Sequence, residues 1–307
     1  MDQTFSLAVH GGAGTVSAAS MTPDAEAGYR AGLRAALHAG HAVLSRGGTA
    51  LDAVTAAVMA LEDDPLFNAG RGAVLTSAGR HEMDAAIMDG RRRRAGAVAG
   101  VCGPRNPVAA ARLVMERSEH VFLVGEGALE FCRVQGLALA DADYFGTEQR
   151  WQALQRELAR RAAGGAGPDA ATRHGTVGAV ARDARGDLAA ATSTGGMTAK
   201  LPGRVGDSPV LGAGTWAENG ACAVSATGHG EFFIRYGVAH EIAARVRLAG
   251  QSLAQAAGAV IAELGTVGGE GGVVAVDANG AVAMPFNSEG MYRGMIGPDG
   301  AARTEIF

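Results

Sequence analysis

The sequence predicts an α+β fold in which helices lie in layers against antiparallel sheets. Helix and strand patterns come in runs and do not alternate strictly, and two strand-turn-strand segments are typical of hairpins. Hydrophobic residues make up 48% of the 307 residues, which is enough for a sizeable core. A doubly wound parallel sheet is the less favoured alternative, because it requires strands and helices in alternation.

The first half of the chain carries clear signals for the ends of its helices. Thr22-Pro23-Asp24 is a strong helix start, because a capping hydroxyl precedes a proline in the first turn, and Gly47-Gly48 ends that helix. Asp63-Asp64-Pro65 ends a second helix, whose apolar residues recur at helical spacing. Strands are expected over residues 5–10, 73–76, 81–88, 95–101 and 120–124, and helices over residues 22–46, 49–62, 107–116 and 126–135.

The second half begins with a polar helix and a segment, residues 163–170, whose Gly, Ala and Pro content is typical of a flexible linker. Asn279-Gly280 favours a tight primed turn between two strands. Helices are expected over residues 151–162, 232–248 and 253–264, a strand over residues 221–225, and hairpins from residues 173–182 with 188–192 and from residues 273–277 with 281–286.

Composition excludes several classes of protein. The 27 basic and 31 acidic side chains give a net charge of −4, so no nucleic-acid partner is expected. No apolar run approaches the roughly 20 residues of a membrane span, so no membrane partner is expected either. The first residues lack a basic and apolar leader pattern, and the three cysteines are too few for a disulfide framework, so we expect a cytoplasmic protein.

Most familiar catalytic patterns do not occur in the sequence. There is no GxSxG serine elbow and no GxGxxG dinucleotide fingerprint, and Lys200, the only lysine, is not part of a phosphate-binding loop. His240-Glu241 begins a zinc motif, but Ala244 stands where its second histidine is required. The basic run Arg91–Arg94 is expected to be a solvated turn, with partner binding as the less favoured alternative.

The pair Gly175-Thr176 carries a different chemistry. A threonine at a new N-terminus combines a hydroxyl nucleophile with an α-amine whose pKa is about 7.7–8.0, so the neutral amine can accept the hydroxyl proton. Such a protein must first cut its own chain, and a small residue, a linker-like segment and a strand surround Thr176 as this requires. The alternative is a plain boundary between loop and strand, since Gly-Thr occurs at five other places, including Gly265-Thr266.

Segments spread over almost the whole chain resemble the plant-type L-asparaginase / isoaspartyl peptidase family of N-terminal nucleophile hydrolases. Their order is that of the family, and the later segments are highly specific. They are residues 10–14, 67–72, 83–90, 175–180, 191–198, 200–209 and 225–231.

The resemblance implies a four-layer αββα sandwich formed by residues 1–307 as one domain. It implies self-cleavage between Gly175 and Thr176 into an α-subunit of residues 1–175 and a β-subunit of residues 176–307, which pair as a dimer of heterodimers. It also implies hydrolysis of small-molecule substrates, namely the side-chain amide of L-asparagine and β-aspartyl (isoaspartyl) dipeptides, without an organic cofactor.

The resemblance also assigns catalytic roles. Thr176 would attack the side-chain carbonyl, and Thr194 would orient its hydroxyl; the alternatives are a buried threonine at a strand start and a cross-strand hydroxyl pair. Thr227 and Gly228 would form the oxyanion hole from a hydroxyl and a backbone N–H. Asn68 would lie near the nucleophile.

The head group of the substrate would be bound by a second set of residues. Arg204 would bind the α-carboxylate through its planar fork, and Asp207 would accept from the α-ammonium. Gly230 would let the backbone approach the bound amino group, while Thr227 and Gly228 also contact the substrate. The alternative is that Arg204 and Asp207 pair with each other at the surface.

The family further implies an alkali ion, sodium or potassium, bound by backbone carbonyls of the loop over residues 61–71. The carbonyls expected to bind it are those of Leu61, Glu62, Asp64, Phe67, Ala69 and Arg71. Two alternative functions remain: an aspartylglucosaminidase-like enzyme, which the Gly before Thr176 and the low cysteine number disfavour, and an unprocessed binding protein on the same fold.

Overall fold

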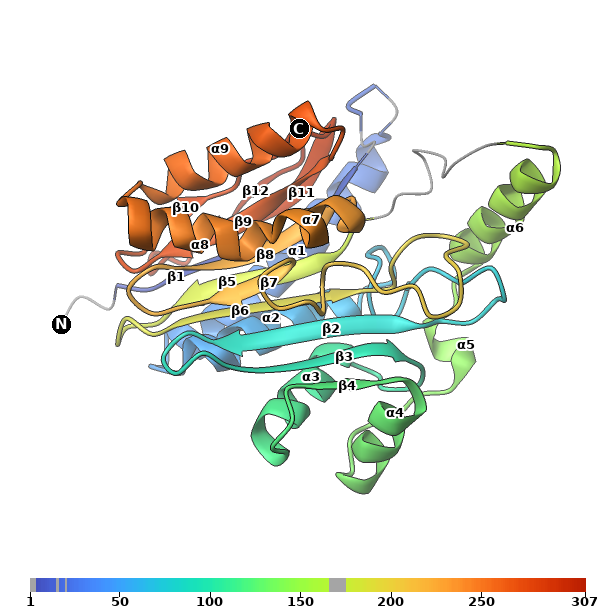
Figure 1. Cartoon of the computed structure of the whole chain (residues 1–307), viewed down its shortest axis with the longest axis horizontal. Coiled ribbons are helices and arrows are strands. Elements are labelled where there is room, and N and C mark those ends of the chain that lie inside the picture. The colour runs from blue at the N-terminus through green and yellow to red at the C-terminus, as the bar shows by residue number, and fades with distance from the viewer. Residues whose placement is uncertain (1–3, 15–16, 20, 166–174) are drawn as a thin grey trace.

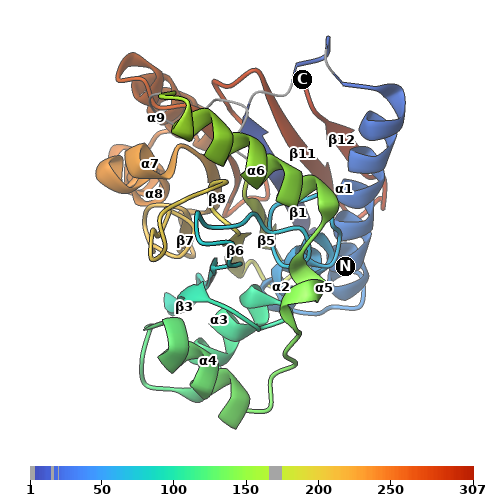
Figure 2. The ribbon, with the colours of Figure 1, turned by 90° about the vertical axis from the view of Figure 1, so that its right-hand side faces the viewer.

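Two sheets lie face to face and helices cover the outer face of each in a computed structural model of the chain. The structure describes residues 4–14, 17–19, 21–165 and 175–307. Figure 1 shows the two sheets at the centre of the molecule, and Figure 2 shows α1 on one side of them and α7, α8 and α9 on the other. This is the αββα sandwich that the resemblance implies, and the α+β prediction is confirmed.

The larger sheet has eight strands in the order β12-β11-β1-β5-β6-β2-β3-β4. All neighbours are antiparallel except β3 and β4, which are parallel. Its strands are β1 (Ser6–Gly14), β2 (Met83–Asp89), β3 (Arg94–Val101), β4 (Phe122–Val124), β5 (Val177–Arg182), β6 (Leu188–Thr194), β11 (Gly290–Ile296) and β12 (Arg303–Glu305).

The smaller sheet has four antiparallel strands in the order β10-β9-β8-β7. They are β7 (Thr215–Ala217), β8 (Cys222–Gly228), β9 (Gly271–Asp277) and β10 (Val282–Ala283). Between the sheets lies a core of small and medium-sized side chains, among them Val180 and Val274. The small residues let the two sheets approach closely, since the bulk between them is mainly alanine, valine and methionine.

The helices cover the outer faces of the sheets through their apolar stripes. Leu33 and Leu37 of α1 and Val54 and Val58 of α2 pack on the larger sheet, and Ile261 of α9 packs on the smaller one. The helices are α1 (Pro23–Leu44), α2 (Ala50–Glu62), α3 (Pro107–Arg117), α4 (Gly125–Val134), α5 (Ala142–Phe145), α6 (Glu148–Ala162), α7 (Gly230–Tyr236), α8 (Val238–Ala249) and α9 (Leu253–Thr266). None of the helices in the described part of the chain is long and apolar enough to cross a membrane.

Side chains of β5 alternate between two cores. Val177, Ala179 and Ala181 belong to the core under the helices, whereas Val180 faces the smaller sheet. Because side chains alternate along a strand, Thr176, just before β5, lies on the same face as Val180. The nucleophile predicted from the sequence therefore points into the space between the two sheets.

Several sequence predictions are wrong in instructive ways. Residues 73–76 form no strand, because the N–H groups of Ala73 and Val74 donate to the Gly70 carbonyl and the Asn68 side chain. The helix expected over residues 232–248 is two helices, since Gly237 adopts φ +56 between them.

The turn at residues 278–280 also differs from its prediction. Only Gly280 has positive φ there, and Asp277 pairs with Ala281 across a three-residue loop in place of the primed two-residue turn. The sequence signals also missed α5, β7, β11 and β12. Residues 166–170 of the expected linker, and His174, lie outside the described residues.

Candidate active site

Thr176 lies where β5 begins, beside the end of β6. Its side chain is 6% exposed, and its hydroxyl donates to Thr194 Oγ1 over 3.2 Å. Val177 pairs with Ser193 in the sheet, so Thr176 and Thr194 face each other as the next pair along the two strands. Thr194 Oγ1 also accepts the Gly196 N–H at 2.9 Å, which fixes its position.

Thr227, near the end of β8, accepts two backbone N–H groups with one hydroxyl oxygen. The donors are Ala13 N and Thr176 N, each at 3.2 Å. A hydroxyl has two acceptor lone pairs and one donor proton, so both of its lone pairs are engaged. The Thr227 proton is therefore left to donate to a third group.

The backbone around Gly175 is packed against the turn in β1. Gly12 has φ +115, and a β-carbon built on it would lie 2.4 Å from the Gly175 α-carbon. A β-carbon on Gly175 would lie 2.1 Å from the Gly12 α-carbon. The register of β1 against β11 shifts between His10 and Gly12, and this irregularity brings the β1 backbone against the bond predicted to be cut.

The buried His10 side chain is hydrogen-bonded to the carbonyl of Thr176. Its Nδ1 lies 2.9 Å from the Thr176 carbonyl oxygen and its Nε2 lies 2.9 Å from Ser225 Oγ. A carbonyl only accepts, so Nδ1 carries the proton and Nε2 accepts from Ser225. Burial lowers the pKa of His10 to about 3, although the Thr176 carbonyl acts in the opposite direction, so the ring is neutral at ordinary pH.

The hydrogen bonds continue from Ser225 into the space between the sheets. Ser225 Oγ lies 2.7 Å from Thr192 Oγ1, which accepts from Thr215 Oγ1 at 2.6 Å. All of these hydroxyl groups are buried. A buried polar network that is satisfied throughout is rigid, so it holds the Thr176 main chain in one position.

Asn68 supports the loop after Thr194 through both ends of its side-chain amide. Its Nδ2 donates to the Gly196 carbonyl at 2.7 Å, and its Oδ1 accepts the Val74 N–H at 2.9 Å. The Gly195 N–H donates to the Asn68 carbonyl. Asn68 thus helps to position the segment that carries Thr194 and Gly196.

An ion pair and a buried carboxyl group lie on one side of Thr176. Arg204 pairs with Glu231 at 3.0 Å and not with Asp207, which is 3% exposed. Among the described residues Asp207 Oδ2 has no hydrogen-bond partner. Burial raises the pKa of Asp207 to about 7, and the positive charge of Arg204 acts in the opposite direction. A buried carboxylate with an open oxygen is suited to bind an ammonium group.

Gly230 and Gly228 keep space open beside these groups. A β-carbon on Gly230 would lie 2.9 Å from Asp207 Oδ1 and 3.0 Å from Arg204 Nη2. Gly228 has φ +153, and a β-carbon on it would lie 2.4 Å from the Glu270 carbonyl oxygen. Position 228 therefore requires glycine, whereas a side chain at position 230 would displace the ends of Asp207 and Arg204.

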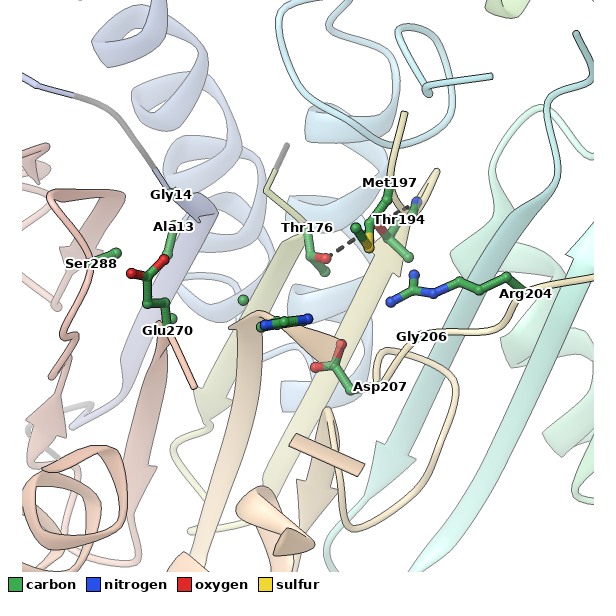
Figure 3. A pocket seen from close by; sticks show the side chains of 14 residues that line it. Ala13, Gly14, Thr176, Thr194, Met197, Arg204, Gly206, Asp207, Glu270 and Ser288 are labelled. Atoms are coloured by element: carbon green, nitrogen blue, oxygen red, sulfur yellow. Dashed lines mark hydrogen bonds between the residues drawn. The ribbon is translucent and has the colours of Figure 1, made fainter. Parts of the chain in front are cut away.

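One pocket joins most of the residues predicted for the site. Figure 3 shows Arg204 and Asp207 on one side of Thr176 and Glu270 and Ser288 on the other. Thr194 and Gly228 also line it, whereas Thr227, Gly230 and Asn68 are not among its lining residues. The pocket can hold a small molecule with an amino-acid head group near Arg204 and Asp207 and a carbonyl near Thr176.

The loop after α2 was predicted to bind an alkali ion. The carbonyls of Glu62 and Asp64 already accept the N–H groups of Arg71 and Phe67, so each has one lone pair left for an ion. A β-carbon on Gly72 would lie 2.5 Å from the Pro65 carbonyl and 2.7 Å from the Phe67 carbonyl. Carbonyl oxygens gathered at such a tight loop fit a hard cation. In the described part of the chain, no cluster of His, Cys, Asp and Glu side chains is arranged as a metal site.

Three residues of the site were not assigned a role from the sequence. His10 and Glu231 act through contacts with Thr176 and Arg204 that are distant in the chain, and Glu270 lies at the pocket because β9 starts beside β8. The glycine-rich turn after His10 was the one local signal. Arg91–Arg94 lies at the hairpin of β2 and β3, as expected of a turn.

The chain is similar to known proteins over almost its whole length. A family model described as asparaginase matches residues 3–306. The chain is 55% identical to the isoaspartyl peptidase of Salmonella typhimurium over 295 residues, which cover 94% of this chain and 93% of that protein. It is 52% identical to the isoaspartyl peptidase of Escherichia coli, over 94% and 91% of the two chains. It is 39% identical to the human isoaspartyl peptidase/L-asparaginase, over 98% of each chain.

Proposed function

The chain belongs to the asparaginase family, and on that premise we propose that it hydrolyses L-asparagine and β-aspartyl dipeptides with Thr176 as the nucleophile. The observation that carries this proposal is the pocket in which the Thr176 hydroxyl faces the space beside Arg204 and Asp207. The head group of an aspartyl substrate would lie at these two side chains and its side-chain carbonyl at the hydroxyl. The names of the relatives do not favour the aspartylglucosaminidase-like alternative.

Maturation is the first step of the proposed mechanism. The chain cuts itself between Gly175 and Thr176, giving an α-subunit of residues 1–175 and a β-subunit of residues 176–307. Support comes from the close approach of Gly12 to Gly175 and from the hydrogen bond between Thr176 and Thr194. Cleavage converts the Thr176 N–H into a primary amine.

The new amine then serves as the base in turnover. It takes the proton of the Thr176 hydroxyl, whose oxygen attacks the side-chain carbonyl of the substrate. The C–N bond breaks, the leaving nitrogen receives the proton, and ammonia or an amino acid departs. Water then hydrolyses the resulting ester, and this releases aspartate and restores the hydroxyl.

Thr227 and Gly228 stabilise the oxyanion in this mechanism. The Thr227 hydroxyl proton is free to donate because its oxygen already accepts two N–H groups. The Gly228 N–H is the second donor that we propose, next to Glu270 and the start of β9. Removing one such donor typically costs about 10²–10³ in rate.

The head group is selected by charge. The Arg204 guanidinium binds the α-carboxylate, Glu231 holds that guanidinium in place, and Asp207 binds the α-ammonium. Substrate binding supplies the positive charge that an ionised Asp207 requires in its buried position. Gly230 leaves the space for this contact.

The remaining expectations concern an ion and the assembly. We propose that the carbonyls of Leu61, Glu62, Asp64, Phe67, Ala69 and Arg71 hold a sodium or potassium ion, which would supply local rigidity and no chemistry.

We further propose a dimer of the αβ heterodimers and a reducing, cytoplasmic environment. The free cysteines Cys102, Cys132 and Cys222 favour such an environment.

Two measurements on one purified sample test the proposed function. N-terminal sequencing of the smaller fragment is expected to begin at Thr176, and ammonia release from L-asparagine and amino-acid release from β-aspartyl-leucine are expected to accompany it. A sample that turns over these substrates as an uncut 30.9 kDa chain would contradict the mechanism. An uncut chain that binds them without turnover would support the binding protein.

A further inference from the structure

The pocket has two chemically different ends, and the proposed function gives each end a role. Arg204 and Asp207 lie at one end of the pocket. Ala13, Glu270 and Ser288 form the other end, and Thr176 lies between the two ends. Among the described lining residues, Arg204 is the only lysine or arginine. The first end therefore carries the arginine beside the carboxylate of Asp207, and the second end carries the carboxylate of Glu270.

The length of the substrate determines what reaches the second end. In an aspartyl group only one methylene separates the α-carbon from the side-chain carbonyl, so in the proposed binding mode the head group lies at Arg204 and Asp207 and the carbonyl lies at Thr176. The leaving group is bonded to the far side of that carbonyl. With L-asparagine it is ammonia, whereas with a β-aspartyl dipeptide it is a whole amino acid that extends toward Glu270.

The main chain holds Glu270 firmly at this end. The Glu270 carbonyl accepts the His229 N–H at 2.8 Å and lies against Gly228, where a β-carbon would approach it to 2.4 Å. The next residue begins β9 in the smaller sheet. The Glu270 side chain is exposed, and Figure 3 shows its carboxylate directed toward Ala13 and Ser288.

We propose that Glu270 determines specificity for the leaving group. Its negative charge favours β-aspartyl dipeptides whose second residue is cationic and disfavours those whose second residue is acidic. The α-carboxylate of the leaving amino acid is common to all such dipeptides, so its repulsion cancels when they are compared. This inference rests on the proposed function and adds the class of leaving group to it.

The test compares β-aspartyl-lysine, β-aspartyl-leucine, β-aspartyl-glutamate and L-asparagine in the mature unchanged protein and in Glu270→Gln. We expect kcat/KM to decrease in the order lysine, leucine, glutamate. The lysine-to-glutamate ratio is expected to fall about fivefold in Glu270→Gln, which is the upper range for one exposed ion pair. In 1 M salt the unchanged protein should approach the ratio of the variant.

Glu289→Gln is the matched control. Glu289 is exposed beside Ser288 and its loss changes the net charge equally, but it does not line the pocket. The ratio in this variant is expected to equal that of the unchanged protein. If L-asparagine is hydrolysed and Glu270→Gln leaves the lysine-to-glutamate ratio unchanged, the role of Glu270 is refuted while the proposed function stands. If none of the four compounds is hydrolysed, the proposed function fails and the role of Glu270 fails with it.

Discussion

Gly12 and Gly175 lie so close together that neither has room for a β-carbon. The contact joins the irregular turn of β1 to the residue before the nucleophile, across a sequence distance of more than half the chain. Since Gly12 also has φ +115, the turn is available only to glycine. The two glycines thereby fix how the backbone enters β5.

We therefore expect Gly12→Ala to accumulate as an uncut chain. A methyl group at this position displaces Gly175 and moves the bond to be cut away from the Thr176 hydroxyl. Gel electrophoresis over time measures the appearance of the two fragments. Gly79→Ala is the control, because Gly79 also has positive φ (+73) but no atom lies within 4 Å of the added carbon. Equal cleavage rates in both variants would mean that the contact between Gly12 and Gly175 is not needed for self-cleavage.

Thr176→Ala is expected to abolish both self-cleavage and turnover. The substitution removes the only oxygen that attacks, so kcat should fall by at least about 10³-fold. Intact mass and ammonia release measure the two effects. Thr266→Ala is the control, because Gly265-Thr266-Val267 repeats the local sequence on the surface at the end of α9. An active Thr176→Ala protein would end the mechanism.

The pH dependence of kcat/KM reports two ionisations in the free enzyme. The pKa of Asp207 is raised to about 7, and the carboxyl must lose its proton to bind the ammonium group. The N-terminal amine, with a pKa of about 8, must also be neutral. Activity on L-asparagine should therefore rise with pH, with a logarithmic slope near two below pH 6, and should fall again above about pH 9, where the free substrate loses the ammonium proton that Asp207 recognises. A slope of one at low pH argues against Asp207, and a flat profile argues against both groups.

The role of His10 is tested by His10→Gln. The change removes the ring that joins Ser225 to the Thr176 carbonyl, so the nucleophile is less well positioned and kcat should fall about tenfold to hundredfold. KM should change little, because His10 does not line the pocket, and the pH profile should keep its shape, since His10 is neutral throughout. His38→Gln, on the exposed side of α1, is the control. A shifted pH profile would instead mean that His10 takes part in proton transfer.

Arg204→Lys is expected to raise KM for L-asparagine about tenfold to hundredfold with a smaller effect on kcat. Lysine keeps the charge but loses the planar fork that holds a carboxylate and Glu231 together. Steady-state kinetics separate the two constants. Arg247→Lys is the control, because Arg247 also pairs with a carboxylate, that of Glu218, and does not line the pocket. A loss confined to kcat would place Arg204 elsewhere in the reaction.

Local signals in the sequence predicted the elements whose ends are fixed locally. Thr22 caps α1 and Ser252 caps α9, and both helices lie close to their predicted ranges. Gly237 misled the prediction, because glycine is tolerated within a helix and only its φ of +56 in the structure shows the break. The strands β11 and β12 were missed since β11 exists through its pairing with β1, at the other end of the chain.

The same division holds for the site. Thr176 was predicted because its chemistry and its neighbours in the chain point to it, and family resemblance added Thr194, Thr227, Arg204 and Asp207. The pairing of Arg204 with Glu231 and the position of Glu270 depend on how β8, α7 and β9 meet in space. No spacing along the chain encodes such contacts, so they required the structure.

The strand order of the larger sheet has a consequence for the protein after it is cut. β1 lies between β11 and β5, and β2 lies beside β6. Two polypeptides made by scission at residue 175 would thus be interdigitated along three seams of main-chain hydrogen bonds, and neither could depart without unravelling the whole sheet. Refolding of the separated subunits is therefore a second-order reaction between two different polypeptides. The precursor, in contrast, forms the same strand pairs within one molecule.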